Sequence, residues 1–151
     1  MNKIKLGILV ATLVLSLQVG IGELYSQNTL RPQDITCLAK NIYMEARGEP
    51  IEGQIAVAQV TINRVRSGVF GSSICKVVYA KNQFSWTLDK RKKIKNNKEW
   101  DASLALATEV LNGKSHIPNF NALYFHTKHI RPKWAKTKTR VTVIANHIFY
   151  S

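Results

Sequence analysis

One glutamate in this sequence stands where a proton donor would be useful. Glu45 lies near the end of a predicted amphipathic helix, directly before a Gly-x-Pro break at residues 48–50. On a helical wheel Glu45 falls about 20° from Leu38, at the rim of the apolar stripe. Partial withdrawal from water raises the pKa of a carboxyl group, which suits a general acid. We therefore predict that Glu45 donates a proton; an ordinary exposed or ion-paired glutamate is the alternative.

The other carboxylates are weaker candidates. Glu49 follows Gly48 and is the alternative acid, but capping of the next helix or pairing with Arg47 or Arg64 is the simpler interpretation. No second carboxylate is placed by the sequence to act as the nucleophile or base of a standard glycosidase pair. This absence fits an enzyme that needs only one carboxyl group.

Histidines and loops give no sign of a metal or a cofactor. His126 and His129 have i, i+3 spacing, but no His-Glu-x-x-His pattern is present, and Pro132 soon after disfavours a helix. The sequence also lacks a glycine-rich phosphate loop and a dinucleotide-binding motif. We predict neither a metal site nor a cofactor.

Aromatic and amide side chains recur in the second half of the chain. Rings can stack on sugar faces, and amides can bind hydroxyl and acetamido groups; a role in the hydrophobic core is the alternative for each ring. The residues concerned are Gln83, Phe84, Trp86, Tyr124, His126, Trp134, Asn146, His147 and Tyr150.

The charge of the chain indicates polyanionic surroundings. Its 22 Lys and Arg against 9 Asp and Glu give a formal net charge of +13. Nucleic acid, an anionic membrane surface and an anionic wall polymer would each attract such a chain, whereas a merely solvated basic surface is the alternative.

The N-terminus narrows this choice because residues 1–22 have the pattern of an export signal. Lys3 and Lys5 precede an apolar stretch over residues 6–19 that is short for a membrane span. The cleavage site at residues 20–22 is poor, so we expect either a signal peptide or an uncleaved anchor over residues 6–22. Export to the periplasm or cell wall favours a wall or membrane surface and argues against nucleic acid.

Export also bears on the two cysteines, Cys37 and Cys75. An even number in an oxidising compartment favours one disulfide, and two buried free thiols are the alternative. Such a bond would close a loop of about 38 residues and stabilise the fold by roughly 3–4 kcal/mol.

The length of 151 residues allows one domain. We expect a linker over residues 23–33 and a single domain over residues 34–151. Apolar periodicity predicts helices from Asp34 or Thr36 to Gly48, over 51–67 and over 100–111; short strands are predicted over 122–125, 141–144 and 147–150. Residues 51–67 are apolar nearly all round and should form the central buried helix, whereas residues 74–79 could be helix or strand. Helices followed by short strands indicate the α+β class.

Several motifs in order resemble the SleB-type cell wall hydrolases, which include spore cortex-lytic enzymes and bacterial and phage relatives. The resemblance spans about residues 34–150. The matching motifs are Ile42-Tyr-Met-Glu-Ala-Arg-Gly-Glu-Pro50, Gly53-Gln-Ile-Ala-Val-Ala58, Ile62-Asn-Arg-Val65, Ile74-Cys-Lys-Val-Val-Tyr79, Asn82-Gln-Phe-Ser85, Tyr124-Phe-His126, Pro132-Lys-Trp134 and Asn146-His-Ile-Phe-Tyr150.

The resemblance implies a lysozyme-like α+β fold, mainly helical with a small sheet, and lytic transglycosylase activity on peptidoglycan glycan strands. In that reaction one glutamate protonates the oxygen between N-acetylmuramic acid and N-acetylglucosamine. The same group then acts as a base while the muramic 6-hydroxyl closes a 1,6-anhydro ring. Carried onto this chain, the acid is Glu45. The implied substrate-binding residues are Gln83, Phe84, Tyr124, Asn146 and His147.

The sequence departs from the family in two respects. It carries no peptidoglycan-binding repeat domain, for which we expect the basic charge to substitute, and Phe125 stands where another histidine is expected. A short basic version of this kind fits a phage endolysin at least as well as a spore enzyme, and we expect a monomer. The alternatives are a muramidase that hydrolyses with water, a non-catalytic cationic wall-binding protein, and a membrane-disrupting protein whose activity survives Glu45→Gln.

Overall fold

The computed structural model describes residues 30–89, 91–95 and 97–151. The predicted signal or anchor over residues 1–22 and most of the predicted linker over residues 23–33 lie outside them. No helix within the described residues is long and apolar enough to cross a membrane.

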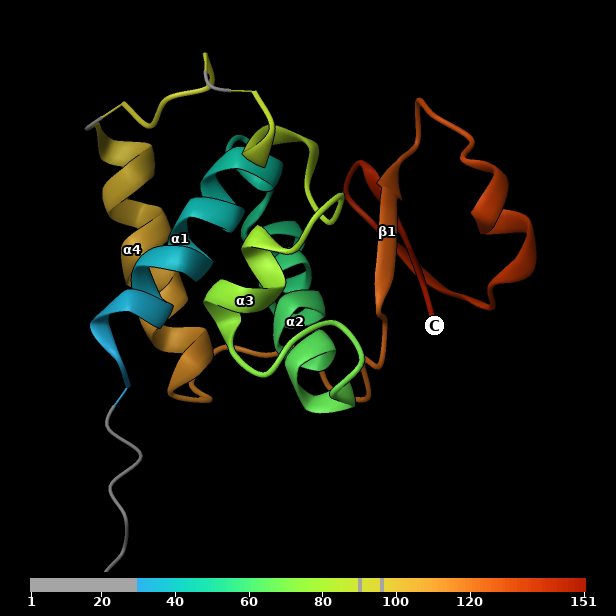
Figure 1. Cartoon of the computed structure of the whole chain (residues 1–151), viewed down its shortest axis with the longest axis horizontal. Coiled ribbons are helices and arrows are strands. Elements are labelled where there is room, and N and C mark those ends of the chain that lie inside the picture. The colour runs from blue at the N-terminus through green and yellow to red at the C-terminus, as the bar shows by residue number, and fades with distance from the viewer. Residues whose placement is uncertain (1–29, 90, 96) are drawn as a thin grey trace, which may run out of the picture.

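Helices form the first part of the described chain and strands the last, as Figure 1 shows. The predicted α+β class, mainly helical with a small sheet, is confirmed. We call residues 30–111 the helical half and residues 112–151 the sheet half. The elements are α1 (Pro32–Ala46), α2 (Ile51–Ser67), α3 (Ile74–Tyr79), the 3-10 helix η1 (Ser85–Thr87), α4 (Lys98–Leu111), β1 (Tyr124–Thr127), the 3-10 helix η2 (Lys133–Thr137), β2 (Arg140–Ile144) and β3 (His147–Tyr150).

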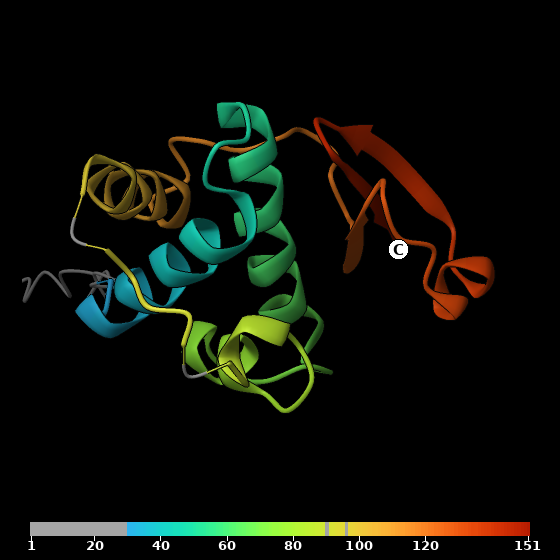
Figure 2. The same cartoon turned by 90° about the horizontal axis from the view of Figure 1, so that it is seen from above.

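Helix α2 is the centre of the molecule, as its apolar pattern predicts. It packs against α1, α3 and α4 and also contacts β2, and Figure 2 shows it between the other helices and the sheet. Val57 and Val60 on this helix are fully buried. The sharp turn from α1 into α2 depends on Gly48, whose φ of +87° is a conformation that glycine adopts without steric cost. This turn places the end of α1 beside α2.

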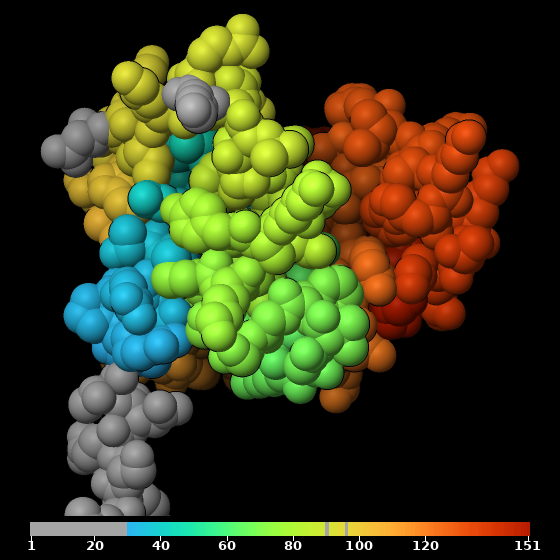
Figure 3. Space-filling model, viewed as in Figure 1, coloured from blue at the N-terminus to red at the C-terminus, as the bar shows by residue number. Residues whose placement is uncertain are grey.

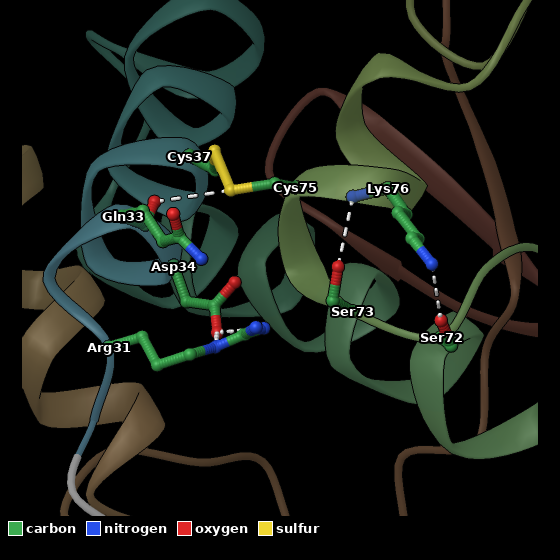
Figure 4. A network of polar contacts seen from close by, with 8 residues as sticks. All are labelled: Arg31, Gln33, Asp34, Cys37, Ser72, Ser73, Cys75 and Lys76. Atoms are coloured by element: carbon green, nitrogen blue, oxygen red, sulfur yellow. Dashed lines mark hydrogen bonds and ion pairs between the residues drawn. A yellow bond between two sulfur atoms is a disulfide. The ribbon is translucent and has the colours of Figure 1, made fainter.

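Cysteines tie α1 to α3 within the helical half. The sulfur atoms of Cys37 and Cys75 lie at bonding distance, 2.14 Å, with their Cα atoms 5.3 Å apart, in agreement with the predicted pair (Figure 4). Helix α3 itself begins at Ser73, whose hydroxyl oxygen accepts a hydrogen bond from the Lys76 N–H at 3.3 Å. This cap explains why residues 74–79 form a helix rather than a strand.

Two other helices begin earlier than the periodicity predicts. Helix α1 starts at Pro32, which suits a first turn because it lacks the N–H that would be unpaired there. Helix α4 starts at Lys98 because the Asn97 side chain accepts a hydrogen bond from the Trp100 N–H at 3.1 Å. Helix α4 therefore begins two residues before the predicted start at Trp100.

The three strands form an antiparallel sheet in the order β1-β3-β2. Central strand β3 carries Phe149, which is fully buried and packs edge-on against Phe120 with ring centroids 5.2 Å apart. Strand β2 has an irregular register between Arg140 and Thr142. The sheet thus has a small aromatic core of its own.

Polar side chains of α2 hold the segment that leads into the sheet. The Asn63 amide donates to the carbonyl oxygens of Phe120 at 2.9 Å and Ala122 at 3.1 Å, and the Arg64 Nε donates to that of Leu123 at 2.7 Å. The carbonyl oxygens of Phe120, Ala122 and Leu123 thus accept hydrogen bonds from side chains of α2. The first strand therefore begins at Tyr124 and not at the predicted residue 122.

Candidate active site

A cavity of about 450 Å³ opens where the two halves meet. Figure 3 shows the furrow between the yellow-green segment before and around η1 and the orange segment around and after β1. The helical half contributes Glu45 from α1, Arg64 from α2 and residues 82–85. The sheet half contributes residues 125–127, Ile130, Pro132 and Trp134. We call it the catalytic cavity because it contains Glu45, the acid predicted from the sequence.

Glu45 is half-buried on the helical wall of this cavity. Burial raises the pKa of its carboxyl group, and the positive charges of Lys92 and Arg64 oppose that rise without cancelling it. The direction agrees with the position predicted from the helical wheel. Glu45 is the only carboxylate among the described residues that line the cavity. Such a group can give a proton and take one back.

Arg64 is a buried cation in the same cavity. Its guanidinium carbon lies 5.3 Å from the ring centre of Phe70 and 5.1 Å from that of Phe84, and burial lowers the pKa of Arg64 to about 10. Its Nη1 is buried without a hydrogen-bond partner among the described residues. The guanidinium is charged at neutral pH and stabilises an ionised Glu45.

Aromatic rings build the opposite wall. His126 is buried, and its Nδ1 lies 2.8 Å from the Thr127 carbonyl oxygen while its Nε2 lies 3.0 Å from the Tyr150 hydroxyl. A carbonyl oxygen can only accept, so Nδ1 carries a proton; in the tautomer that has its single proton there, Nε2 accepts from the Tyr150 hydroxyl. Trp134 packs edge-on against this imidazole at 5.6 Å and is 37% exposed. An exposed ring beside a cavity can stack on a sugar face.

The structure brings three of the six predicted site residues together. Glu45, Gln83 and Phe84 line the catalytic cavity. Tyr124 lies next to the cavity residue Trp134, with ring centroids 5.7 Å apart, but is not among the lining residues. A role of these residues in catalysis or binding stays a prediction.

Asn146 and His147 lie elsewhere. The backbone N–H and side-chain amide of Asn146 donate to the Glu49 carboxylate at 3.1 and 2.9 Å. Partial burial opposes the ionisation of Glu49, but these hydrogen bonds outweigh it and lower its pKa. His147 is 1% exposed, packs against Phe125 at 5.2 Å, and has its pKa lowered by burial. Both residues therefore support the sheet in this structure, and their predicted contact with substrate stays a prediction.

Arg64 was predicted from the sequence only as a possible ion-pair partner of Glu49, and its place beside Glu45 was missed. The sequence offered little signal for a buried Arg64, because α2 also carries the charged residues Glu52 and Arg66, and both of these are exposed. His126 and Trp134 were part of the predicted aromatic group and do line the cavity. Within the described residues, no group of three or more His, Cys, Asp or Glu side chains is placed to hold a metal ion.

Comparisons with known proteins point in one direction. The family described as "Cell Wall Hydrolase" matches residues 48–150, beginning just after Glu45. A spore cortex-lytic enzyme of Oceanobacillus iheyensis is 34% identical over 132 residues, which cover 87% of this chain and 44% of that protein. The spore cortex-lytic enzyme of Bacillus subtilis is 32% identical over 77% of this chain and 37% of its own length. The chain thus spans less than half the length of these curated relatives.

Solved structures agree. The catalytic domain of the germination-specific lytic transglycosylase SleB from Bacillus anthracis has a TM-score of 0.69 and 31% identity, covering 82% of this chain and 98% of that domain. The catalytic domain of the Bacillus cereus SleB protein has a TM-score of 0.67 and 31% identity, covering 80% of this chain and 91% of that one. The described fold is therefore that of these catalytic domains.

Proposed function

Because the chain belongs to the cell wall hydrolase family, we propose that it degrades peptidoglycan as a lytic transglycosylase with Glu45 as its acid and base. Membership in the family confirms the resemblance predicted from the motifs. The observation that carries the mechanism is a single half-buried carboxyl group, of raised pKa, in a cavity between two halves of the fold.

The first step is proton donation. Protonated Glu45 gives its proton to the oxygen between N-acetylmuramic acid and N-acetylglucosamine, and the bond from that oxygen to the muramic C1 breaks. The carboxylate left behind faces the developing positive charge on the sugar. Arg64, in the same cavity, stabilises the newly ionised Glu45.

The second step returns the enzyme to its starting state. The muramic 6-hydroxyl attacks C1, and its proton passes to the Glu45 carboxylate, so the products are a 1,6-anhydro-muramic end and a free N-acetylglucosamine end. No water is consumed. One carboxyl group serves both steps, which fits a cavity that has Glu45 as its only carboxylate among the described residues.

Binding would use the rest of the cavity. Gln83 offers an amide to hydroxyl or acetamido groups, and Trp134 offers a partly exposed ring to a sugar face. We also propose that the chain is exported by residues 1–22, works as a monomer in the periplasm or cell wall, and is drawn to anionic wall polymers or membrane surfaces by its net charge of +13.

Mass spectrometry of the products tests the reaction. Purified peptidoglycan treated with the chain should release muropeptides lighter by one water molecule than hydrolytic products, and the Glu45→Gln variant should release none. Reducing ends instead of anhydro ends would identify a muramidase and contradict the single-carboxylate mechanism. Wall binding without any product, on several wall types, would leave a non-catalytic wall-binding protein.

A further inference from the structure

A second cavity, of about 350 Å³, adjoins the catalytic cavity. The two share His126, Ile130 and Pro132 in their linings, so a molecule that fills one touches residues that also line the other. The second cavity lies wholly on the sheet half and contains no carboxylate among its lining residues. We call it the cationic cavity.

Its charge comes from three side chains. Lys128, Arg131 and Lys136 all line the cationic cavity, all are exposed, and none forms an ion pair within the described residues. The positive charge of Lys128 helps to lower the pKa of Glu49, but the Glu49 carboxylate already accepts two hydrogen bonds from Asn146. The three cations therefore have no ion-pair partner among the described residues.

Acidic residues are absent from the whole sheet half, and not only from the lining of the cationic cavity. Residues 112–151 contain seven Lys and Arg and no Asp or Glu, while every acidic residue of the chain precedes residue 110. The acid-free half thus presents a positive potential beside the site that cleaves the glycan. The walls between the cations are apolar, formed by Ala135, Ile148 and the 54% exposed Ile130. Cations spaced by apolar surface fit an anionic ligand that also carries methyl groups.

We infer that the cationic cavity binds a carboxylate of the peptide stem carried by the muramic acid of the substrate. The inference rests on the proposed function, since a glycan strand in the catalytic cavity would carry its stem outward from the muramic ring next to the cleaved bond. Stem peptides combine alanine methyl groups with free carboxylates, and Arg131 offers a guanidinium that pairs with a carboxylate in bidentate geometry. The site would make the enzyme distinguish stem-bearing from bare glycan.

The test compares two substrates and two variants of the full chain. Soluble glycan oligomers with tetrapeptide stems are measured beside the same oligomers after an amidase has removed the stems. The variant Arg131→Gln/Lys136→Gln removes two charges from the cationic cavity. The control Lys114→Gln/Lys133→Gln removes two exposed charges from the same half, outside the linings of both cavities.

We expect the first variant to raise KM for the stem-bearing oligomers roughly 3–10-fold more than KM for the bare ones, the combined size of two exposed ionic contacts. The control should raise both KM values equally and slightly. An equal rise on both substrates with the first variant, or the same selective rise with the control, would overturn the inference in favour of general charge attraction. Stronger competition by a glycerol phosphate oligomer than by the free tetrapeptide would overturn it in favour of a phosphate polymer.

A binding titration separates this inference from the proposed reaction. The stem-bearing and bare disaccharides are titrated into the Glu45→Gln protein, with and without Arg131→Gln/Lys136→Gln. If no substrate is cleaved by the unmodified chain but the stem still strengthens binding through these two residues, the cationic cavity stands and the transglycosylase mechanism fails. If cleavage proceeds and the stem adds no affinity, the cavity assignment fails alone.

Discussion

The helical half and the sheet half of this chain differ in charge and in what holds them together. The helical half contains every acidic residue of the described chain, a disulfide and a continuous aliphatic core around Leu38, Ile42 and Leu106. The sheet half has no acidic residue and packs mainly through aromatic rings such as Phe120 and Phe149. This difference fits the proposed function, in which the helical half holds the acid Glu45 and the sheet half offers the substrate a cationic, aromatic wall.

The largest effect is expected when the proposed acid, Glu45, is replaced. Glu45→Gln should lower kcat by roughly 10²- to 10⁴-fold, because the amide cannot donate the proton that the leaving oxygen needs. The readout is the rate of muropeptide release from purified peptidoglycan, with circular dichroism to verify the fold. Glu49→Gln is the matched control and should keep most of the activity, because its carboxylate is committed to Asn146. A large loss in Glu49→Gln together with an active Glu45→Gln would reverse the assignment.

The disulfide tests the rigidity of the helical half. Cys37→Ser/Cys75→Ser should lower the free energy of unfolding by roughly 3–4 kcal/mol, since the bond closes a long loop in the unfolded chain. Denaturant unfolding measures this, and activity well below the midpoint should survive because the bond joins α1 to α3 away from the catalytic cavity. A reducing agent should destabilise the unmodified chain and leave the double variant unchanged. Equal stability of the two proteins would mean that the thiols are free.

The junction between the halves is tested at Asn63. Asn63→Ala removes two hydrogen bonds to the carbonyls of Phe120 and Ala122 and should lower the free energy of unfolding by about 1–3 kcal/mol. Because this segment leads into β1, KM should rise as well. The exposed Asn112→Ala, at the end of α4, is the control and should change neither quantity noticeably. Loss of stability without any change in KM would show that the junction does not position the cavity wall.

The smallest effects concern pH. A raised pKa of Glu45 means that its protonated form is favoured in the folded protein, so the stabilising contribution is complete at acidic pH and is lost as pH rises through the folded pKa. Activity should decline over the same rise because the acid loses its proton. Glu45→Gln should therefore be more stable than the unmodified chain at neutral pH, by about 0.5–2 kcal/mol, and equally stable at acidic pH. Thermal unfolding across pH measures the difference; a constant gap at all pH values would contradict the raised pKa.

Much of the fold could be predicted because its signals are local. Apolar periodicity predicted both ends of α2 and the cores of α1 and α4. Pro32 in the first turn of α1 and the Asn97 cap of α4 explain why these two helices begin earlier than predicted. The strands were predicted to within two residues. Strand β2 begins one residue early, and β1 begins and ends two residues late because side chains of α2 bind the carbonyl oxygens before it. These hydrogen bonds join residues 59 positions apart in the sequence, and the apolar periodicity of a single segment cannot reveal them.

The candidate site divides in the same way. The sequence by itself determined that Glu45 stands at the rim of an apolar helix face, that two cysteines can pair, and that the motifs belong to one family. Only the tertiary structure decided that Arg64 shares the cavity with Glu45, that Asn146 holds Glu49, and that His147 is buried. The physical reason is that a helical wheel fixes the direction of a side chain relative to its own helix, whereas burial and pKa depend on which other elements close over it.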